Sequence, residues 1–162
     1  MSLEIAGRVR SAAVRRRGPH VLGVDAGQGE AMQLLDHVSI TVRDLDRCRP
    51  FYEAIMKALG AERVRSTADA IGFGSRCSAA DDGHTYLTVL SSPDAGGDPG
   101  RHWCFKATSP EAVRAFHLAG LRHGGRDDGA PGLRPHYHEH YFGAFLLDPE
   151  GNRLEAVCHR ES

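Results

Sequence analysis

The chain has 162 residues, of which 41% are hydrophobic and 25% charged, values typical of a globular protein that can build one core. A formal net charge of -1 gives no general attraction to nucleic acid or to an anionic membrane, and no stretch reaches the roughly 20 apolar residues of a membrane-spanning helix. The four cysteines lack C-x-x-C spacing, which favours free thiols in a reducing, cytoplasmic compartment.

Residues 1–31 differ from the rest of the chain. They contain an arginine run, but no apolar stretch of the length that a secretory signal needs. We therefore expect a flexible N-terminal extension; an alternative is a short arm that packs on a partner subunit. The folded domain is expected to span residues 33–160.

The first folded segment opens with a strand over residues 34–42, where polar and apolar residues alternate and place His37, Ser39 and Thr41 on one face. Acidic residues at 44–46 favour the start of a helix. The elements expected next are a helix over 47–59 that ends at Gly60, strands near 62–66, 69–74 and 85–90, and a turn-rich linker over 91–100.

The second segment repeats this order. It opens with a strand in which His102, Cys104 and Lys106 share one face, and Ser109 followed by Pro110 predicts a helix start. The later elements are the helix that ends at 124–125, a turn-rich stretch over 127–138 with at most a short strand, and a hairpin of strands over 141–147 and 152–158. The pattern predicts an α+β protein made of two βαβββ modules, residues 33–92 and 100–160.

The two segments are copies of one plan. A shift of 65 positions places His37 on His102 and Gly60 on Gly125. Repeated units of this size usually bury their apolar faces against each other, so the two histidines are expected in equivalent positions around a shared interior. That arrangement could assemble a metal site from residues that are distant in sequence.

Glu155 is the carboxylate that most needs an explanation. It lies within an apolar strand, where a charge is costly unless it is paired or bound to a metal. Its face of the strand could be the one that carries His37 and His102. Two imidazoles and one carboxylate form a triad that suits Fe(II), and equally Mn, Ni or Zn.

Three stretches resemble the vicinal oxygen chelate superfamily: LLDHVSITVRDLDRCRPFYEAIMKALG, GRHWCFKATSPEAVRAFHLAG and YFGAFLLDPEGNRLEAVCH. This superfamily includes glyoxalase I, extradiol dioxygenases, fosfomycin resistance enzymes and bleomycin-binding proteins. The resemblance covers about residues 33–160 and implies paired βαβββ modules that form one open, cupped mixed sheet with helices outside. It also implies metal ligands on the first and last strands of each module, here His37, His102 and Glu155.

The chain departs from the glyoxalase I pattern at the fourth ligand position. Alignment of the two modules places Thr88 where that family member has a second glutamate, and a neutral hydroxyl is a poor ligand. The remaining His/His/Glu set is more similar to the triad of extradiol dioxygenases, although those enzymes usually carry a second pair of modules. The bleomycin-binding relatives are a third possibility, as a metal-free module that sequesters a ligand.

A second concentration of functional side chains lies at residues 136–141, which read HYHEHY. We interpret His136, Tyr137 and His138 as candidate catalytic proton carriers beside the metal; the alternative is a solvated loop. The candidate substrate contacts are Thr88, Lys106 and Arg134.

The sequence therefore predicts a glyoxalase-like, metal-dependent enzyme of the lyase or isomerase type. One divalent ion (Zn, Ni, Mn or Fe(II)) would be chelated by two adjacent oxygens of a small-molecule substrate. An Fe(II) ring-cleaving dioxygenase and a metal-free binding module are the alternatives. A homodimer is expected, because family members often pair modules between chains, and neither nucleic acid nor membrane is expected as a partner.

Overall fold

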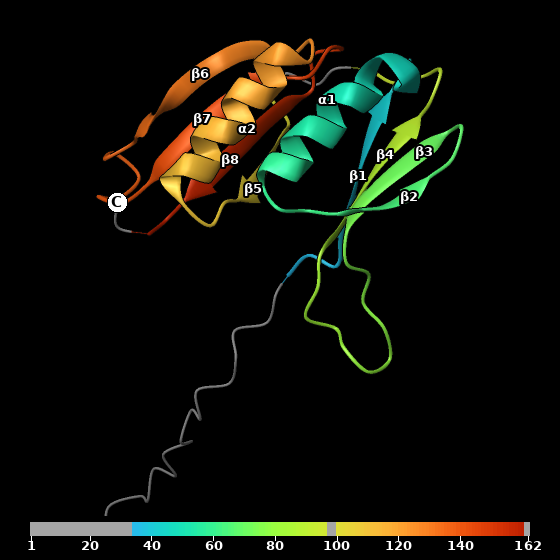
Figure 1. Ribbon diagram of the computed structural model, residues 1–162, viewed down its shortest axis with the longest axis horizontal. Coiled ribbons are helices and arrows are strands. Elements are labelled where there is room, and N and C mark those ends of the chain that lie inside the picture. Colours follow the sequence, from blue (N-terminus) through green and yellow to red (C-terminus); the bar gives the residue numbers. More distant parts are fainter. Residues whose placement is uncertain (1–33, 97–99, 161–162) are drawn as a thin grey trace, which may run out of the picture. The chain divides into compact units, whose positions relative to one another are not determined.

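The computed structural model describes residues 34–96 and 100–160, so the predicted N-terminal extension lies outside the described residues. Each module has the predicted βαβββ order (Figure 1). The first contains β1 (His37–Val42), α1 (Leu45–Ala58), β2 (Arg63–Ser66), β3 (Ala70–Gly74) and β4 (Tyr86–Ser91). The second contains β5 (His102–Lys106), α2 (Pro110–Arg122), β6 (Arg126–Leu133), β7 (Phe142–Leu147) and β8 (Arg153–Cys158). The predicted α+β fold is confirmed.

Each module forms its own four-stranded mixed sheet. The strand orders are β1-β4-β3-β2 and β5-β8-β7-β6, so the first and last strands of a module lie side by side and run parallel. The remaining neighbours are antiparallel. As a result β1 and β5, which carry the two predicted histidine ligands, are edge strands of their sheets.

The helices begin and end within about two residues of the predicted positions. Asp44 caps α1 by accepting a hydrogen bond from the backbone N–H of Arg47 at 2.9 Å, and Ser109 accepts one from Ala112 at 3.3 Å ahead of α2. Gly60 follows α1 with φ +78°, a left-handed conformation that glycine adopts without steric cost. These local signals fix the helix boundaries independently of tertiary packing.

The segment 126–133 is the main departure from the predicted elements. It forms the eight-residue strand β6, where the sequence predicted a turn-rich stretch with at most a short strand. The pairing of β6 with β7 is irregular on both sides of Gly129, and β6 is an edge strand. An irregular edge strand tolerates glycine and Pro131, and this explains why its sequence lacks the usual alternation.

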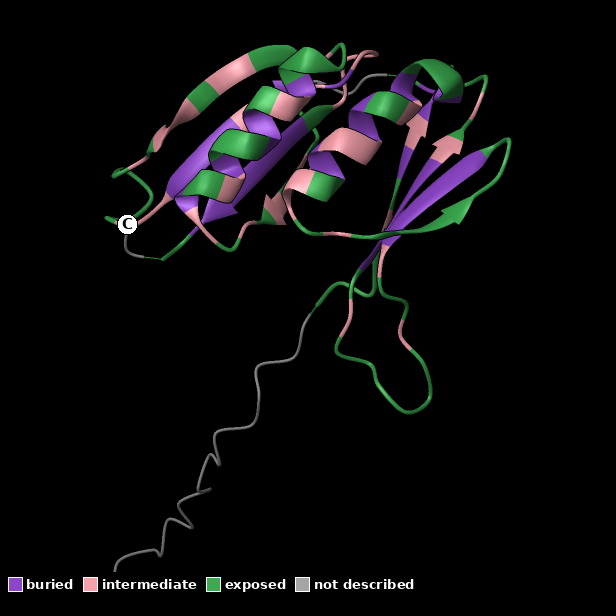
Figure 2. Ribbon diagram, viewed as in Figure 1, coloured by how far each residue is buried: buried purple, intermediate pink, exposed green. Residues whose placement is uncertain are grey.

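One hydrophobic core joins the two modules. Phe51 and Ile55 of α1 and Phe116 of α2 are fully buried in the same cluster as Leu146 and Leu154. Burial of each such side chain contributes roughly 1.5–3 kcal/mol. In Figure 2 the buried residues gather on the central strands and on one side of each helix, whereas β2 and β6 are largely exposed.

Gly120 of α2 allows this close packing. A Cβ atom at that position would lie 2.3 Å from the Leu146 Cδ1 atom and 3.1 Å from a ring carbon of Phe51. Any larger residue would therefore push α2 away from both α1 and the second sheet.

A buried polar turn also links the modules. Asp148 is fully buried and accepts a 2.8 Å hydrogen bond from the Tyr52 hydroxyl of α1. The Glu150 carboxylate accepts hydrogen bonds at 2.7 Å from the backbone N–H groups of Arg43 and Asp44, directly before α1. The turn after β7 thus binds both the start and the middle of the first module's helix.

The other face of each sheet is free of helices. On β1, Ile40 and Val42 are buried in the core, whereas His37 and Ser39 are exposed on the opposite face. The predicted alternation along β1 is therefore confirmed. In the described part of the chain, no helix is long and apolar enough to cross a membrane.

Candidate functional site

The register of the parallel strands shows which residues of the two modules are equivalent. The paired positions are His37–Tyr86 and Ser39–Thr88 in the first sheet, and His102–Arg153 and Cys104–Glu155 in the second. His37 is thus equivalent to His102, and Thr88 to Glu155, as the alignment of the two modules predicts. Thr88 is 7% exposed and offers only a hydroxyl at this position.

Glu155 lies at the centre of a polar cluster on the helix-free face of the second sheet. It is only 3% exposed, and its Oε2 atom lies 3.4 Å from the Nε2 atom of His102. The Tyr141 hydroxyl donates a 2.6 Å hydrogen bond to the other oxygen, Oε1. A carboxylate this deeply buried normally needs several charge-stabilising partners.

Gly143 makes room for this arrangement. A Cβ atom there would lie 3.2 Å from the ring of Tyr141 and 3.3 Å from Oε1 of Glu155. Both contacts are tight, so a side chain on β7 at this position would disturb the hydrogen bond between the two residues. The sequence alone did not identify Tyr141 as a partner of Glu155, although its two-residue spacing from Gly143 on the same face was visible.

The cluster also raises the pKa of its neutral members. Cys104 is exposed as a residue, but the burial of its thiol and then the charge of Glu155 raise the pKa of that thiol to about 12. Burial, followed by the hydrogen bond to Glu155, raises the pKa of Tyr141 well above its usual value. Both groups therefore stay protonated at neutral pH.

His37 does not join this cluster within the described chain. It lies on the first sheet, where its Nδ1 atom is 2.5 Å from Oδ1 of Asp36 and both side chains are 65% exposed. Among residues 34–96 and 100–160, no three His, Cys, Asp or Glu side chains come close enough together to hold a metal ion. One chain therefore brings together His102 and Glu155, but not the full predicted triad.

The histidine-rich run forms turns rather than an extended strand, so its histidines do not share one strand face. His136 packs on Tyr137 with ring centroids 4.3 Å apart, and Tyr137 packs on Tyr141 at 4.7 Å. These ring contacts connect the run to Glu155 through Tyr141. His138 lies 2.8 Å, nitrogen to nitrogen, from His159, a partner that the sequence did not indicate.

The two remaining substrate candidates form no hydrogen bond or ion pair with Glu155 in the described part of the chain. Lys106 is exposed on β5, at the far end from His102. Arg134 donates hydrogen bonds to the β6 carbonyl oxygens of Ala130 at 2.7 Å and Leu133 at 3.3 Å. Its guanidinium carbon also lies 6.0 Å from the centroid of the Phe145 ring, and Phe145 pairs with Glu155 in the strand register, so Arg134 lies near the Glu155 cluster.

A family model, the Glyoxalase/Bleomycin resistance protein/Dioxygenase superfamily, matches residues 34–156. The chain belongs to this superfamily. The match covers both βαβββ modules, in agreement with the resemblance seen in the sequence. Membership fixes the fold, while the particular activity, metal dependence and substrate differ among glyoxalases, dioxygenases and resistance proteins.

Solved structures of superfamily proteins are similar to this chain. A glyoxalase/bleomycin resistance protein from Albidiferax ferrireducens is 28% identical, with a TM-score of 0.67 over 78% of this chain and 99% of that one. A glyoxalase/bleomycin resistance protein/dioxygenase family enzyme from Burkholderia phytofirmans is 18% identical, with a TM-score of 0.57 over 77% and 98% of the two chains. A glyoxalase-related enzyme from Fulvimarina pelagi is 13% identical, with a TM-score of 0.56 over 78% and 88%. The comparison with curated proteins gave no match.

Proposed function

We propose that the protein is a glyoxalase-like, metal-dependent enzyme of the lyase or isomerase type that acts on a small molecule with two adjacent oxygens. The observation that carries this proposal is the environment of Glu155. Its carboxylate is 3% exposed, yet its hydrogen-bond partners among the described residues are two neutral groups, the Tyr141 hydroxyl and the Cys104 thiol, with His102 at 3.4 Å. Because an under-compensated buried anion is costly, the site suits a cation between Glu155 and His102.

The donor chemistry fits a divalent ion. Oε2 of Glu155 and Nε2 of His102 already face each other, and imidazole with carboxylate suits Zn, Ni, Mn and Fe(II). When bound, such an ion polarises a substrate oxygen or lowers the pKa of a bound water. Since the described chain supplies two donors at this place, a third must come from elsewhere.

We assign the third ligand to His37 of a second copy in a homodimer. The strands β1 and β5 are sheet edges, and the helix-free faces that carry His37 and His102 are exposed. Free edges and open faces are surfaces on which a second copy can pack. If β1 of one copy lies beside the second module of the other, the predicted triad of His37, His102 and Glu155 is complete.

The protein groups around Glu155 have distinct tasks. Tyr141 holds one carboxylate oxygen through its hydroxyl proton, so the other oxygen is oriented toward His102. Because burial raises the pKa of Tyr141, this proton stays on the hydroxyl at neutral pH. Tyr137 and His136, which follow by ring contacts, are the proposed route for a proton between substrate and solvent, together with His138.

Metal content of purified protein tests the proposal. The chain is loaded with Zn, Ni, Mn and Fe(II) in turn, and the bound metal per chain is measured for wild type, Glu155→Gln and His102→Ala. The matched controls are Glu139→Gln and His123→Ala, which change exposed residues of the same module. About one ion per chain in wild type and controls, with loss in both site variants, is the expected result.

The outcome of this experiment also selects the reaction. Equal metal content in all variants, or no metal in the wild type, would show that Glu155 and His102 do not form a metal site. If the bound metal is iron and the protein consumes oxygen with catechols, the dioxygenase assignment replaces the isomerase one.

A metal-free binding module is the second candidate. The observation in its favour is that no three potential ligands meet among the described residues of one chain. A monomer that binds no metal but retains a small molecule would support this function.

A further inference from the structure

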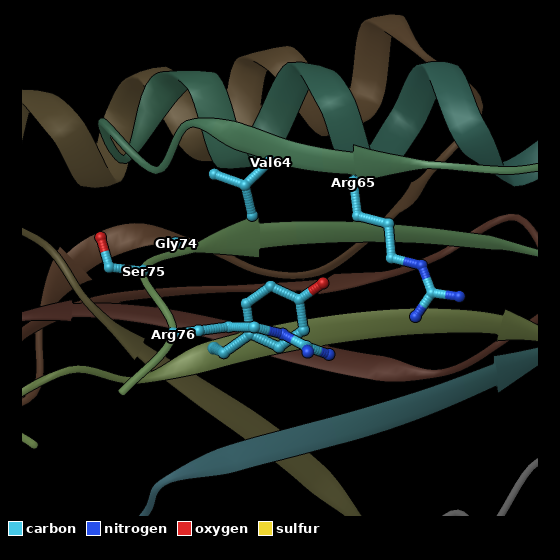
Figure 3. Close-up of a pocket in the computed structure, with 6 residues that line it drawn as sticks. Val64, Arg65, Gly74, Ser75 and Arg76 are labelled. Atoms are coloured by element: carbon cyan, nitrogen blue, oxygen red, sulfur yellow. The ribbon is translucent and has the colours of Figure 1, made fainter. Parts of the chain in front are cut away.

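The first module contains a cavity on its sheet that the proposed metal site does not use. Its volume is about 480 Å³, and it is lined by Val64, Arg65, Gly74, Ser75, Arg76 and Tyr86 (Figure 3). These residues come from β2, from the end of β3 with the segment that follows it, and from the start of β4. Leu87 and Val89 point into the core, so Tyr86 lies on the helix-free face, as does its strand partner His37.

Tyr86 has an unusual hydroxyl. The residue is 3% exposed, and its oxygen is the one buried side-chain polar atom in the described part of the chain without a hydrogen-bond partner. Leaving a buried hydroxyl unpaired costs free energy, and natural proteins seldom retain such a group without a use for it. The unpaired Tyr86 hydroxyl therefore indicates that an acceptor atom of a ligand binds here.

Glycines on β3 hold this hydroxyl in place. A Cβ atom at Gly72 would lie 1.9 Å from the Tyr86 oxygen, so no other residue fits beneath it. Gly74, with φ +83°, faces Tyr86 in the strand register. The face of β3 is thus bare at both positions, and the ring of Tyr86 can lie across it. The sequence of β3, AIGFG, encodes this surface.

Two arginines bring positive charge to the same cavity. Arg65 enters from β2 and Arg76 from the segment after β3, as Figure 3 shows. The Arg76 guanidinium carbon lies over the Tyr86 ring, 4.5 Å from its centroid. In the described ranges neither guanidinium forms a hydrogen bond or an ion pair within 4.0 Å.

The carboxylates near these arginines are engaged with other groups. Asp36, near Arg76, contacts the His37 ring at 2.5 Å. Asp69, near Arg65, accepts a hydrogen bond from the Thr67 hydroxyl at 2.7 Å. The positive charge of the cavity is therefore not neutralised by a direct partner from the protein.

We propose that this cavity binds the carboxylate of a small organic acid. The guanidinium groups of Arg65 and Arg76 match the two oxygens of a carboxylate. When the Arg76 guanidinium turns from the Tyr86 ring to the ligand, the buried Tyr86 hydroxyl becomes able to donate a further hydrogen bond. Val64, which is 56% exposed, offers contact for the apolar part of the molecule. Ser75 lines the cavity on the side away from Arg65, as Figure 3 shows.

The cavity lies next to His37, so a substrate bound at the proposed metal centre would also reach the cavity. This part of the inference rests on the proposed metal enzyme: a substrate chelated by a centre that includes His37 would extend its carboxylate to Arg65 and Arg76. The substrate class would then be small acids that carry adjacent oxygens as well as the carboxylate. Binding of the anion itself does not depend on the metal.

Titration of metal-free protein with benzoate tests the inference. Amide chemical shifts of Gly72, Gly74 and Ser75 are followed by NMR, with benzamide as the neutral ligand of the same shape. We expect saturable shifts with benzoate and none with benzamide. The loss of affinity should be about tenfold in Arg65→Gln and in Arg76→Gln, because each removes a charge-assisted contact. Arg63→Gln is the matched control on the same strand, since Arg63 pairs with Glu53 of α1 at 2.5 Å.

Tyr86→Phe gives a second, independent readout. It should weaken benzoate binding and at the same time raise the midpoint of thermal unfolding, because it removes only the unpaired hydroxyl. A lower midpoint would show that the hydroxyl has a partner and would overturn the proposal. So would equal binding of benzamide, or unchanged affinity in both arginine variants. Tighter binding of phenyl phosphate with the same dependence on the arginines would overturn the carboxylate assignment.

These outcomes are separate from those of the metal experiment. Benzoate binding to protein that never takes up metal would retain the anion site and reject the enzyme. Metal binding without benzoate binding would retain the proposed metal enzyme and reject the anion site.

Discussion

At the scale of single residues, Glu155 determines how the site responds to a cation. Its buried carboxylate interacts with the Tyr141 hydroxyl, the Cys104 thiol and, at 3.4 Å, His102. A ligand that binds only the folded state stabilises it according to its concentration relative to Kd. Metal binding should therefore raise the free energy of unfolding, and the size of this increase should depend on the charge of residue 155.

The corresponding prediction concerns Glu155→Gln. Metal at 100 times Kd should raise the free energy of unfolding of the wild type by about 2.7 kcal/mol and leave that of the variant unchanged. Denaturant unfolding with and without metal measures both values. Glu139→Gln, which neutralises an exposed carboxylate in the same module, should behave as the wild type. A full metal effect in Glu155→Gln would contradict the assignment of this ligand.

Cys48 provides a prediction for pH. Burial raises the pKa of its thiol from 9.0 to about 12. Above pH 9 the unfolded state loses this proton while the folded state keeps it, so the free energy of unfolding falls as the pH rises from about 9 to about 12. Cys48→Ala should reduce the slope over this window by up to about 1.4 kcal/mol per pH unit. Chemical denaturation at several pH values measures the slope, and an identical slope in the variant would contradict the account.

At the scale of elements, the turn at 148–152 joins the modules. Asp148 is satisfied by the Tyr52 hydroxyl, by two backbone N–H groups and by the Asn152 amide, all between 2.8 and 2.9 Å. Glu150 binds the backbone before α1. The DPEGN segment, residues 148–152, belongs to a stretch that resembles the superfamily. Its hydrogen bonds give it a structural role, which is to join the two modules.

Substitutions in this turn should destabilise the fold without removing metal. Tyr52→Phe is expected to cost about 1 kcal/mol, because Asp148 keeps its other donors, and Asp148→Ala about 3 kcal/mol, because several buried donors lose their acceptor. Thermal or denaturant unfolding measures these changes. Metal content that falls together with stability in Tyr52→Phe would indicate a direct role of this turn in the site.

The sequence predicted the elements with strong local signals and missed those without them. Both helices carry caps at Asp44 and Ser109, so their boundaries followed from side-chain chemistry. Strand β6 carries glycines and a proline and pairs irregularly, so no period-2 pattern existed to detect. The turns of the histidine-rich run are closed by backbone hydrogen bonds, from Tyr137 to Arg134 and from Tyr141 to His138. The contact of His138 with His159 is tertiary, so the local sequence gave no signal for it.

At the scale of the whole molecule, the internal repeat predicted part of the candidate site. Alternation along a strand fixes the face of each side chain within its own sheet, which placed His102 with Glu155 correctly on one face. It does not determine how one sheet meets another. For this reason the sequence could place His37 on the corresponding face of the first module but not its distance from Glu155. The two arginines and the tyrosine of the first module's cavity had no sequence signal beyond the glycines of β3.

The proposed assembly predicts the mass of the particle in solution. Light scattering after gel filtration should give about twice the 17.6 kDa of one chain. A monomeric mass together with full metal content would show that one chain completes the site by itself.

Metal content of mixed dimers tests the central claim most directly. His37→Ala and Glu155→Ala chains are each expected to bind no metal. When the two are refolded together in equal amounts, random pairing makes half of the dimers mixed, and one of the two sites in each mixed dimer contains an intact His37, His102 and Glu155. The account predicts recovery of about a quarter of the wild-type metal per chain. No recovery, while the wild type refolded in parallel regains its metal, would contradict a site shared between two copies.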